Sequence, residues 1–124
     1  ATSSERILYG YSMGGRFACF VLFQKPALFQ KFILGSSWLM EEGTIVQTLE
    51  PDYAQTHQDL PAQVLLTAGS LEKQAVKGNE DFLKLMQSRR YPNLKIQTIT
   101  FDGFNHGTSI PVTLMRGLQW AFCQ

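Results

Sequence analysis

Residues 6–24 read RILYGYSMGGRFACFVLFQ, and this stretch decides the fold. It begins with a short apolar run, Arg6–Tyr9, that ends at Gly10. A denser apolar run, Phe17–Gln24, follows and is closed by Pro26. Short apolar runs bounded by glycine or proline are typical of buried strands, whereas the longer run suits a helix. We therefore predict a strand, a glycine-rich turn and a helix in that order.

The remainder of the chain repeats the order of strand and helix. The expected strands are Phe32–Leu34, Val64–Thr67 and Lys95–Phe101. The expected helices are a weak patch at Thr44–Leu49 that Pro51 ends, Asn79–Arg90, and a last helix capped by Ser109 with Leu114, Leu118 and Ala121 on one face. Such alternation is typical of parallel strands joined by right-handed crossovers. We predict an α/β fold with about four mostly parallel strands and helices on both faces.

The composition narrows the classes of function. Of the 124 residues, 44% are hydrophobic and 17% are charged, and the net charge is +1, which suits one domain with a real core and not a disordered tail. A nearly balanced charge gives no reason to expect nucleic acid or an anionic membrane as a partner. No apolar run approaches the roughly 18 residues of a membrane span. Two cysteines, Cys19 and Cys123, are too few for a disulfide scaffold or a four-cysteine zinc site.

Three interpretations compete for the motif Gly10–Gly15, which reads GYSMGG. The spacing of its outer glycines matches a phosphate-binding loop, but Arg16 and Phe17 stand where that loop needs lysine and a magnesium-binding hydroxyl. A dinucleotide-binding motif fails because it requires glycine at position 12, which is Ser12. The remaining interpretation is G-x-S-x-G, the nucleophile elbow between a strand and a helix.

The elbow has a physical rationale. A sharp turn forces the serine backbone into a strained conformation, so we expect that Gly10 and Gly14 must be small. The Ser12 hydroxyl would then stand at the N-terminus of a helix, where the backbone N–H of Met13 and the helix dipole stabilise a developing oxyanion. The alternative is a glycine-rich turn that carries an incidental serine.

A nucleophilic serine needs a base, and the chain offers His57 and His106. In α/β-hydrolases the order along the chain is serine, carboxylate, histidine. His106 lies in a turn-rich segment between the last expected strand and the last helix, at the end of the sheet where the elbow lies. His57 lies in a polar stretch before the third strand, and we expect it on the surface.

The third member of a triad is a carboxylate that orients the histidine. Glu72 follows the third expected strand closely and is the candidate. Asp102, four residues before His106, is the rival, although a structural role in the turn at the strand end explains it better. A dyad of Ser12 and His106 without a carboxylate is the remaining option.

Five segments together resemble a known family. They are GYSMGG at 10–15, Pro26 and Phe29 three residues apart, the strand end Gly35-Ser36-Ser37-Trp38, the strand end Gly69-Ser70-Leu71-Glu72, and Asn105-His106-Gly107. The chain resembles the C-terminal half of the esterase-D-type esterases of the α/β-hydrolase fold, which include feruloyl esterases, mycolyltransferases and hydrolases of trilactone siderophores.

This resemblance implies a role for each matching position. Ser12 would be the nucleophile, His106 the base and Glu72 the acid, with Met13 in the oxyanion hole. The loop of Ser37 and Trp38 would line the substrate pocket, and Tyr11 from the motif is a further substrate-binding candidate. The substrate would be a small-molecule ester, and we expect neither a metal nor an organic cofactor.

In this family the nucleophile lies near the middle of the chain, whereas here it is residue 12. We therefore expect residues 1–124 to be the C-terminal half of the domain, without the upstream strands and the second oxyanion donor. The first strand would then be an unprotected edge, which predicts self-association or pairing with the missing half, and weak or no activity alone. The alternative function is a non-catalytic binding or assembly module that keeps the elbow for its fold.

Overall fold

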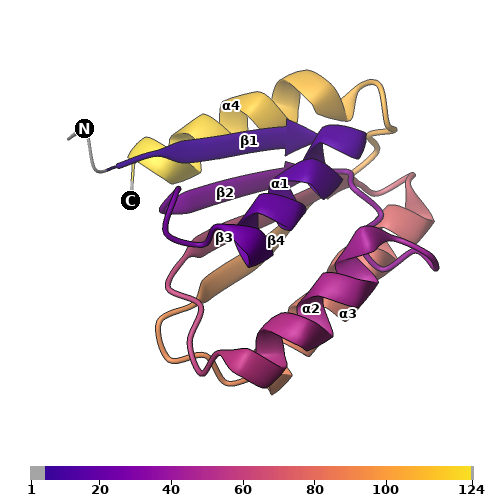
Figure 1. The fold of residues 1–124 in the computed structure, drawn as a ribbon. Coiled ribbons are helices and arrows are strands. Elements are labelled where there is room, and N and C mark those ends of the chain that lie inside the picture. The colour runs from indigo at the N-terminus through magenta and orange to yellow at the C-terminus, as the bar shows by residue number, and fades with distance from the viewer. Residues whose placement is uncertain (1–4, 124) are drawn as a thin grey trace.

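A computed structural model describes residues 5–123, which form one four-stranded sheet with four helices (Figure 1). The strand order is β1-β2-β3-β4 and every neighbouring pair is parallel. The strands are β1 (Ile7–Tyr11), β2 (Lys31–Gly35), β3 (Gln63–Gly69) and β4 (Lys95–Phe101). The helices are α1 (Met13–Gln24), α2 (Ile45–Thr56), α3 (Lys73–Ser88) and α4 (Ser109–Phe122). The predicted α/β class, with parallel strands and helices on both faces, is confirmed.

The helices divide unequally between the two faces of the sheet. Figure 1 shows α1, α2 and α3 on one face and α4 on the other. Successive residues of a strand point to opposite faces, so Phe32 and Leu34 of β2 join the larger core while Ile33 faces α4. Gly117 lets α4 approach the sheet, because a Cβ there would lie 3.0 Å from the Ile33 side chain. Right-handed crossovers between consecutive neighbouring strands explain why three helices share one face.

Two predicted helix boundaries were wrong. Helix α2 continues through Pro51 and ends at Thr56. Proline removes one backbone hydrogen bond, but residues on both sides of it are held by tertiary contacts that offset this loss. Glu50 pairs with Arg89 of α3, and the Tyr53 ring packs against Phe23.

Helix α3 begins at Lys73, six residues before the predicted start at Asn79. Its first turns are buried through Ala75 and Gly78, which lack the large apolar side chains that mark a helix in a sequence. A Cβ on Gly78 would lie 3.9 Å from the backbone nitrogens of Leu39 and Met40, an ordinary contact distance. At the last helix, Thr108 and not Ser109 occupies the N-cap position.

The faces near β1 carry exposed apolar side chains. In the described part of the chain, β1 pairs only with β2 and is an edge strand. Beside it, Met13 and Phe17 of α1 are exposed. On the other face the exposed large apolar side chains of α4 are Ile110, Leu114, Met115, Leu118 and Phe122. Within residues 5–123, no helix has the length and apolar character that crossing a bilayer requires.

The two cysteines are both free. Cys19 is buried in α1, and burial raises the pKa of its thiol far above the ordinary value, with the nearby Glu50 adding to the effect. Cys123 is exposed just after α4, which covers the other face of the sheet. Cys19 therefore acts as a small core side chain.

Candidate active site

Ser12 occupies the turn between β1 and α1 in a conformation that few residues adopt. It is the N-cap residue of α1, with φ 59° and ψ −120°. Its backbone N–H donates to the Gly35 carbonyl at 2.7 Å, which ties the turn to the end of β2. Strained backbone conformations of this kind cluster at functional sites.

The glycines around Ser12 serve the turn unequally. A Cβ at Gly10 would lie 2.1 Å from the Gly14 carbonyl oxygen, so only glycine fits there. A Cβ on Gly14 itself would meet nothing within 4 Å, so our expectation of a steric requirement at Gly14 was wrong. The second tight position is Gly15, where a Cβ would lie 1.7 Å from the Ser37 hydroxyl.

The first amide groups of α1 lie next to Ser12. The N–H groups of Gly15 and Arg16 donate back to the Ser12 carbonyl. The Met13 N–H belongs to the first turn, where helical amides lack an intrahelical acceptor. Such an amide, at the positive end of the helix dipole, is available to an anion beside Ser12.

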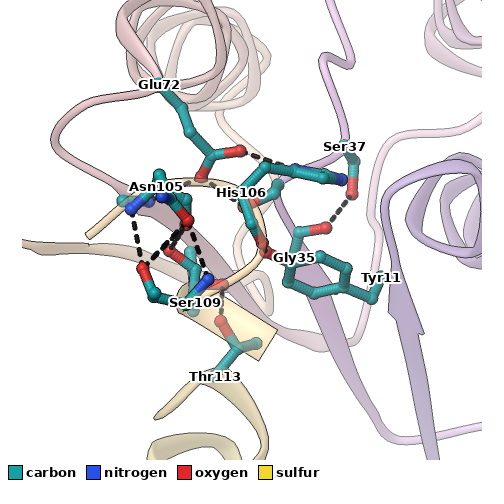
Figure 2. A network of polar contacts seen from close by, with 12 residues as sticks. Tyr11, Gly35, Ser37, Glu72, Asn105, His106, Ser109 and Thr113 are labelled. Carbon is teal, nitrogen blue, oxygen red and sulfur yellow. Dashed lines mark hydrogen bonds and ion pairs between the residues drawn. The ribbon is translucent and has the colours of Figure 1, made fainter. Parts of the chain in front are cut away.

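His106 lies in the loop between β4 and α4 and is held from three sides. Figure 2 shows it between Glu72 and Tyr11. Its Nδ1 lies 2.6 Å from Glu72 Oε1, and its carbonyl accepts the Tyr11 hydroxyl at 2.5 Å. The Tyr11 and Trp38 rings flank the imidazole, with centroids at 5.1 and 4.9 Å. The His106 side chain is 43% exposed, so its free edge is open to a ligand.

A compact turn fixes the backbone of His106. Asn105 Oδ1 accepts the Thr108 N–H at 2.8 Å, and the Thr108 hydroxyl accepts the Asn105 N–H at 2.8 Å. The Ser109 hydroxyl donates to the Asn105 carbonyl at 2.6 Å (Figure 2). Reciprocal bonds of this type hold a loop without regular structure, so the imidazole is presented by a rigid segment.

Glu72 caps α3 just beyond β3, and its side chain is only 5% exposed. Its Oε2 accepts the Gly69 N–H and the Ser36 hydroxyl, each at 2.8 Å. These two donors leave Oε1 facing His106. The rival carboxylate, Asp102, is exposed and accepts a long hydrogen bond of 3.5 Å from Ser70. Of the two candidates, the structure brings Glu72 to His106.

The predicted substrate-binding residues differ in their surroundings. Trp38 is half-buried with φ +46°, and its ring borders His106. Ser37 is buried, and its hydroxyl donates to the Gly35 carbonyl at 3.0 Å. Tyr11 is half-buried; burial is the main cause that raises the pKa of its phenol, and the charge of Glu72 contributes. Tyr11 therefore stays protonated and donates its hydroxyl to His106.

His57, the other histidine, is placed elsewhere. It follows the C-terminal end of α2, and its ring stacks on Tyr53 with centroids 3.9 Å apart. Helix α2 runs back toward the start of β3, whereas Ser12, Glu72 and His106 all follow the carboxyl ends of strands. In the described part of the chain, no three His, Cys, Asp or Glu side chains are grouped to hold a metal ion.

Two residues of the site carry no signal of their own in the sequence. Ser36, with φ +45°, is fully buried and donates to Glu72. Arg16 binds the loop after β2 through its guanidinium group. Four non-glycine residues among 5–123 have positive φ, and three of them, Ser12, Ser36 and Trp38, lie at this site. That concentration of strained backbone is independent of the motifs and marks the same place.

No family model matches the chain, but comparison with known proteins finds a curated relative and several similar solved structures. The ferri-bacillibactin esterase BesA of Bacillus subtilis (strain 168) is 28% identical over 123 aligned positions, covering 94% of this chain and 43% of BesA. The crystal structure of the BES protein of Bacillus cereus is also 28% identical, with a TM-score of 0.77, and the match covers 95% of this chain and 45% of that one.

A third relative agrees in fold. The siderophore hydrolase EstB of Aspergillus nidulans has a TM-score of 0.76 at 23% identity, covering 95% of this chain and 49% of EstB. The chain thus spans less than half the length of each of these relatives. In sequence the chain is similar to the esterase BesA, and its fold matches half of an α/β-hydrolase domain, as its motifs predicted.

Proposed function

We propose that this chain carries the nucleophile, base and acid of a serine carboxylic-ester hydrolase. The observation that carries the proposal is the contact of 2.6 Å between His106 Nδ1 and Glu72 Oε1. Tyr11, the residue immediately before Ser12, contacts the same histidine with its hydroxyl and its ring. A strained serine, a histidine that contacts the residue before that serine, and a buried carboxylate at the Nδ1 of the histidine are the groups that activate a serine hydroxyl.

The reaction follows from these positions. Ser12 Oγ attacks the ester carbonyl carbon while its proton passes to His106 Nε2. The carbonyl oxygen becomes an oxyanion that the Met13 N–H stabilises. Collapse of the tetrahedral intermediate breaks the bond to the alcohol oxygen, which takes the proton from His106, and leaves Ser12 acylated.

Water completes the cycle. His106 takes a proton from a water molecule whose oxygen attacks the acyl carbon, and then returns the proton to Ser12 Oγ as the acid leaves. Glu72 holds the imidazole with Nδ1 protonated, so that Nε2 is free to accept, and stabilises the imidazolium in each half-reaction.

We infer that the substrate is a small-molecule ester, and the relatives indicate which esters to test first. BesA is named for a ferri-bacillibactin esterase activity and EstB for siderophore hydrolysis. Siderophore esters are therefore the substrate class that we propose for the complete protein.

We further propose that residues 1–124 act as the C-terminal half of a domain. Supporting this, the chain spans less than half of its relatives, β1 is an edge strand, and apolar side chains of α1 and α4 are exposed beside it. The second oxyanion donor would come from the other half. Loss of one such donor lowers kcat by a factor of about 10²–10³ in comparable sites, so the chain alone should be a weak catalyst.

A fluorophosphonate probe tests the proposal directly, because it phosphonylates only an activated serine. Intact-mass spectrometry of the treated chain should show one adduct, which the Ser12→Ala variant lacks. His106→Asn should slow labelling strongly, whereas the matched variant His57→Asn should not.

A negative result is resolved by a second measurement. If the chain alone is not labelled, labelling is repeated with the complete protein that contains it. An unlabelled Ser12 in the complete protein, or an adduct that survives Ser12→Ala, would contradict the proposed nucleophile and favour a non-catalytic module.

A further inference from the structure

Arg16, one helical turn after Ser12, holds the loop that follows β2. Its Nε donates to the Ser37 carbonyl at 2.8 Å, and its Nη2 donates to the Trp38 carbonyl at 3.2 Å and to Glu41 Oε2 at 2.7 Å. The Arg16 side chain is 21% exposed. The planar guanidinium presents several donors in a fixed geometry, so one side chain binds two consecutive carbonyl groups.

The same loop meets α1 at a second point. The Gly15 backbone approaches Ser37 so closely that a Cβ on Gly15 would lie 1.7 Å from the Ser37 hydroxyl. Ser36 and Trp38, on either side of Ser37, have φ of +45° and +46°. Non-glycine residues keep this conformation only where surrounding contacts hold them in it. For Trp38, those contacts include the guanidinium of Arg16.

The position of Trp38 matters because its ring borders His106. The two ring centroids are 4.9 Å apart at an interplanar angle of 42°. Arg16 binds the carbonyl of this same tryptophan, so the helix that begins at Ser12 also determines where the indole lies. The nucleophile and one wall of the site are thereby fixed to a single element, α1.

We propose that Arg16 is a positioning residue: by binding the Ser37 and Trp38 carbonyls, it sets the place of the Trp38 indole beside His106 and so the shape of the substrate side of the site. The proposal rests on the proposed function for the role of His106, but its structural content does not require turnover. Arg16 acts through Trp38 and does not itself meet the ester.

We expect the planar set of donors on the Arg16 guanidinium, and not its positive charge, to hold the Trp38 indole in place. Glu41, the anionic partner of Arg16, is 61% exposed, and exposed ion pairs contribute little. Lysine would keep the charge of Arg16 but offers a compact ammonium on a flexible stem, which cannot reproduce the planar fork. Arg16→Lys and Arg16→Gln should therefore behave alike, and Glu41→Gln should behave like the parent chain.

The fluorescence of Trp38 provides the measurement, since a protonated imidazole in contact with an indole quenches its emission. The chain has two tryptophans, so Trp120→Phe leaves Trp38 as the reporter. In this background the emission should fall when lowering the pH protonates the imidazole beside Trp38. His106→Asn should abolish the change, and His57→Asn should preserve it.

In the same background, Arg16→Gln and Arg16→Lys should each reduce the pH-dependent quenching by about half or more, because the indole is no longer held in one place. Arg116→Gln, the same substitution at an exposed arginine of α4, is the matched control and should leave the quenching unchanged. Far-UV circular dichroism verifies that each variant is folded. If Arg16→Gln is not folded, the charge-preserving variant Arg16→Lys provides the test instead.

Full quenching in Arg16→Lys would overturn the proposal, because charge alone would then suffice. Equal losses in Arg16→Gln and Arg116→Gln would also overturn it. The fluorescence measurement needs no substrate. A chain that no fluorophosphonate probe labels and that hydrolyses no ester therefore still reports on Arg16. Failure of the proposed function and failure of this inference are therefore distinguishable.

Discussion

At the scale of single residues, the hydroxyl of Ser36 decides how Glu72 faces His106. Ser36 is fully buried and supplies one of the two donors to Glu72 Oε2. Ser36→Ala keeps the Cβ, and therefore leaves the backbone preference almost unchanged, but removes this donor. The free energy of unfolding should fall by about 1–3 kcal/mol, the usual effect of removing a hydrogen bond to a charged, buried group. Urea denaturation measures it.

Ser37→Ala is the matched control for that experiment. The Ser37 hydroxyl donates to the Gly35 carbonyl, which also accepts the Ser12 N–H, so its loss leaves no acceptor without a partner. Its effect should stay near 1 kcal/mol or below, as for a neutral hydrogen bond. A Ser36→Ala variant as stable as Ser37→Ala would show that the donor does not stabilise the Glu72 carboxylate.

The glycines of the elbow give a second prediction at this scale. Gly10→Ala should destabilise the fold by about 3 kcal/mol or more, because its Cβ would lie 2.1 Å from a backbone oxygen that cannot move freely. Gly14→Ala, in the first turn of α1, meets no atom and replaces a poor helix former, so it should be neutral or stabilising by up to about 1 kcal/mol. Thermal unfolding of the two variants should shift in opposite directions, and equal destabilisation would contradict this account of the turn.

At the scale of elements, the strands could be predicted more accurately than the helices. Buried strands of a parallel sheet are continuous apolar runs, so β2 and β3 were found within two residues at each end, and the alternation of polar and apolar residues located β4. The helices predicted for α2 and α3 were too short, because an internal proline in α2 and small residues in α3 hide their true length. The extra turns of α2 are held by Phe23 of α1 and by Arg89 just after α3, and the first turns of α3 pack against the loop at residues 38–40; no local pattern records these contacts.

The pair of Glu50 on α2 and Arg89 after α3 is such a contact. Both guanidinium bonds to the carboxylate are 2.7 Å long, and the Glu50 side chain is 2% exposed. Arg89→Met would leave this charge buried without its partner, which should lower the free energy of unfolding by about 3 kcal/mol. The neighbouring Arg90 is exposed, and Arg90→Met should change stability little. Guanidinium chloride denaturation of both variants checks this, and similar stabilities would show that the pair holds no helix in place.

At the scale of the whole molecule, the candidate site was predictable where chain order constrains it. Ser12, Glu72 and His106 follow the carboxyl ends of β1, β3 and β4, and the topology of a parallel sheet brings such positions to one edge. Ser36 and Arg16 were missed for the opposite reason. Each is a single polar residue whose partner lies far along the chain. Glu72 lies 36 residues after Ser36, and Ser37 lies 21 residues after Arg16. Only the folded backbone shows these pairs.

The exposed apolar surface beside β1 leads to the last prediction. An open strand edge and apolar side chains on both faces favour association, because pairing buries the edge and removes apolar area from water. Sedimentation velocity of the chain alone should show dimers or larger species whose fraction rises with concentration. Phe17→Glu and Leu118→Glu, on opposite faces of the sheet, should each shift the chain toward monomer.

Leu71→Glu is the control for these variants, because Leu71 is at least as exposed as Phe17 and Leu118 but lies between β3 and α3, away from the β1 edge. It should leave the distribution unchanged, since a charge there meets no partner across the interface. If the parent chain is monomeric at every concentration, or if Leu71→Glu disperses it as effectively as Leu118→Glu, the surface beside β1 is not an interface. The pairing proposed for the two halves of the domain would then lose its physical basis.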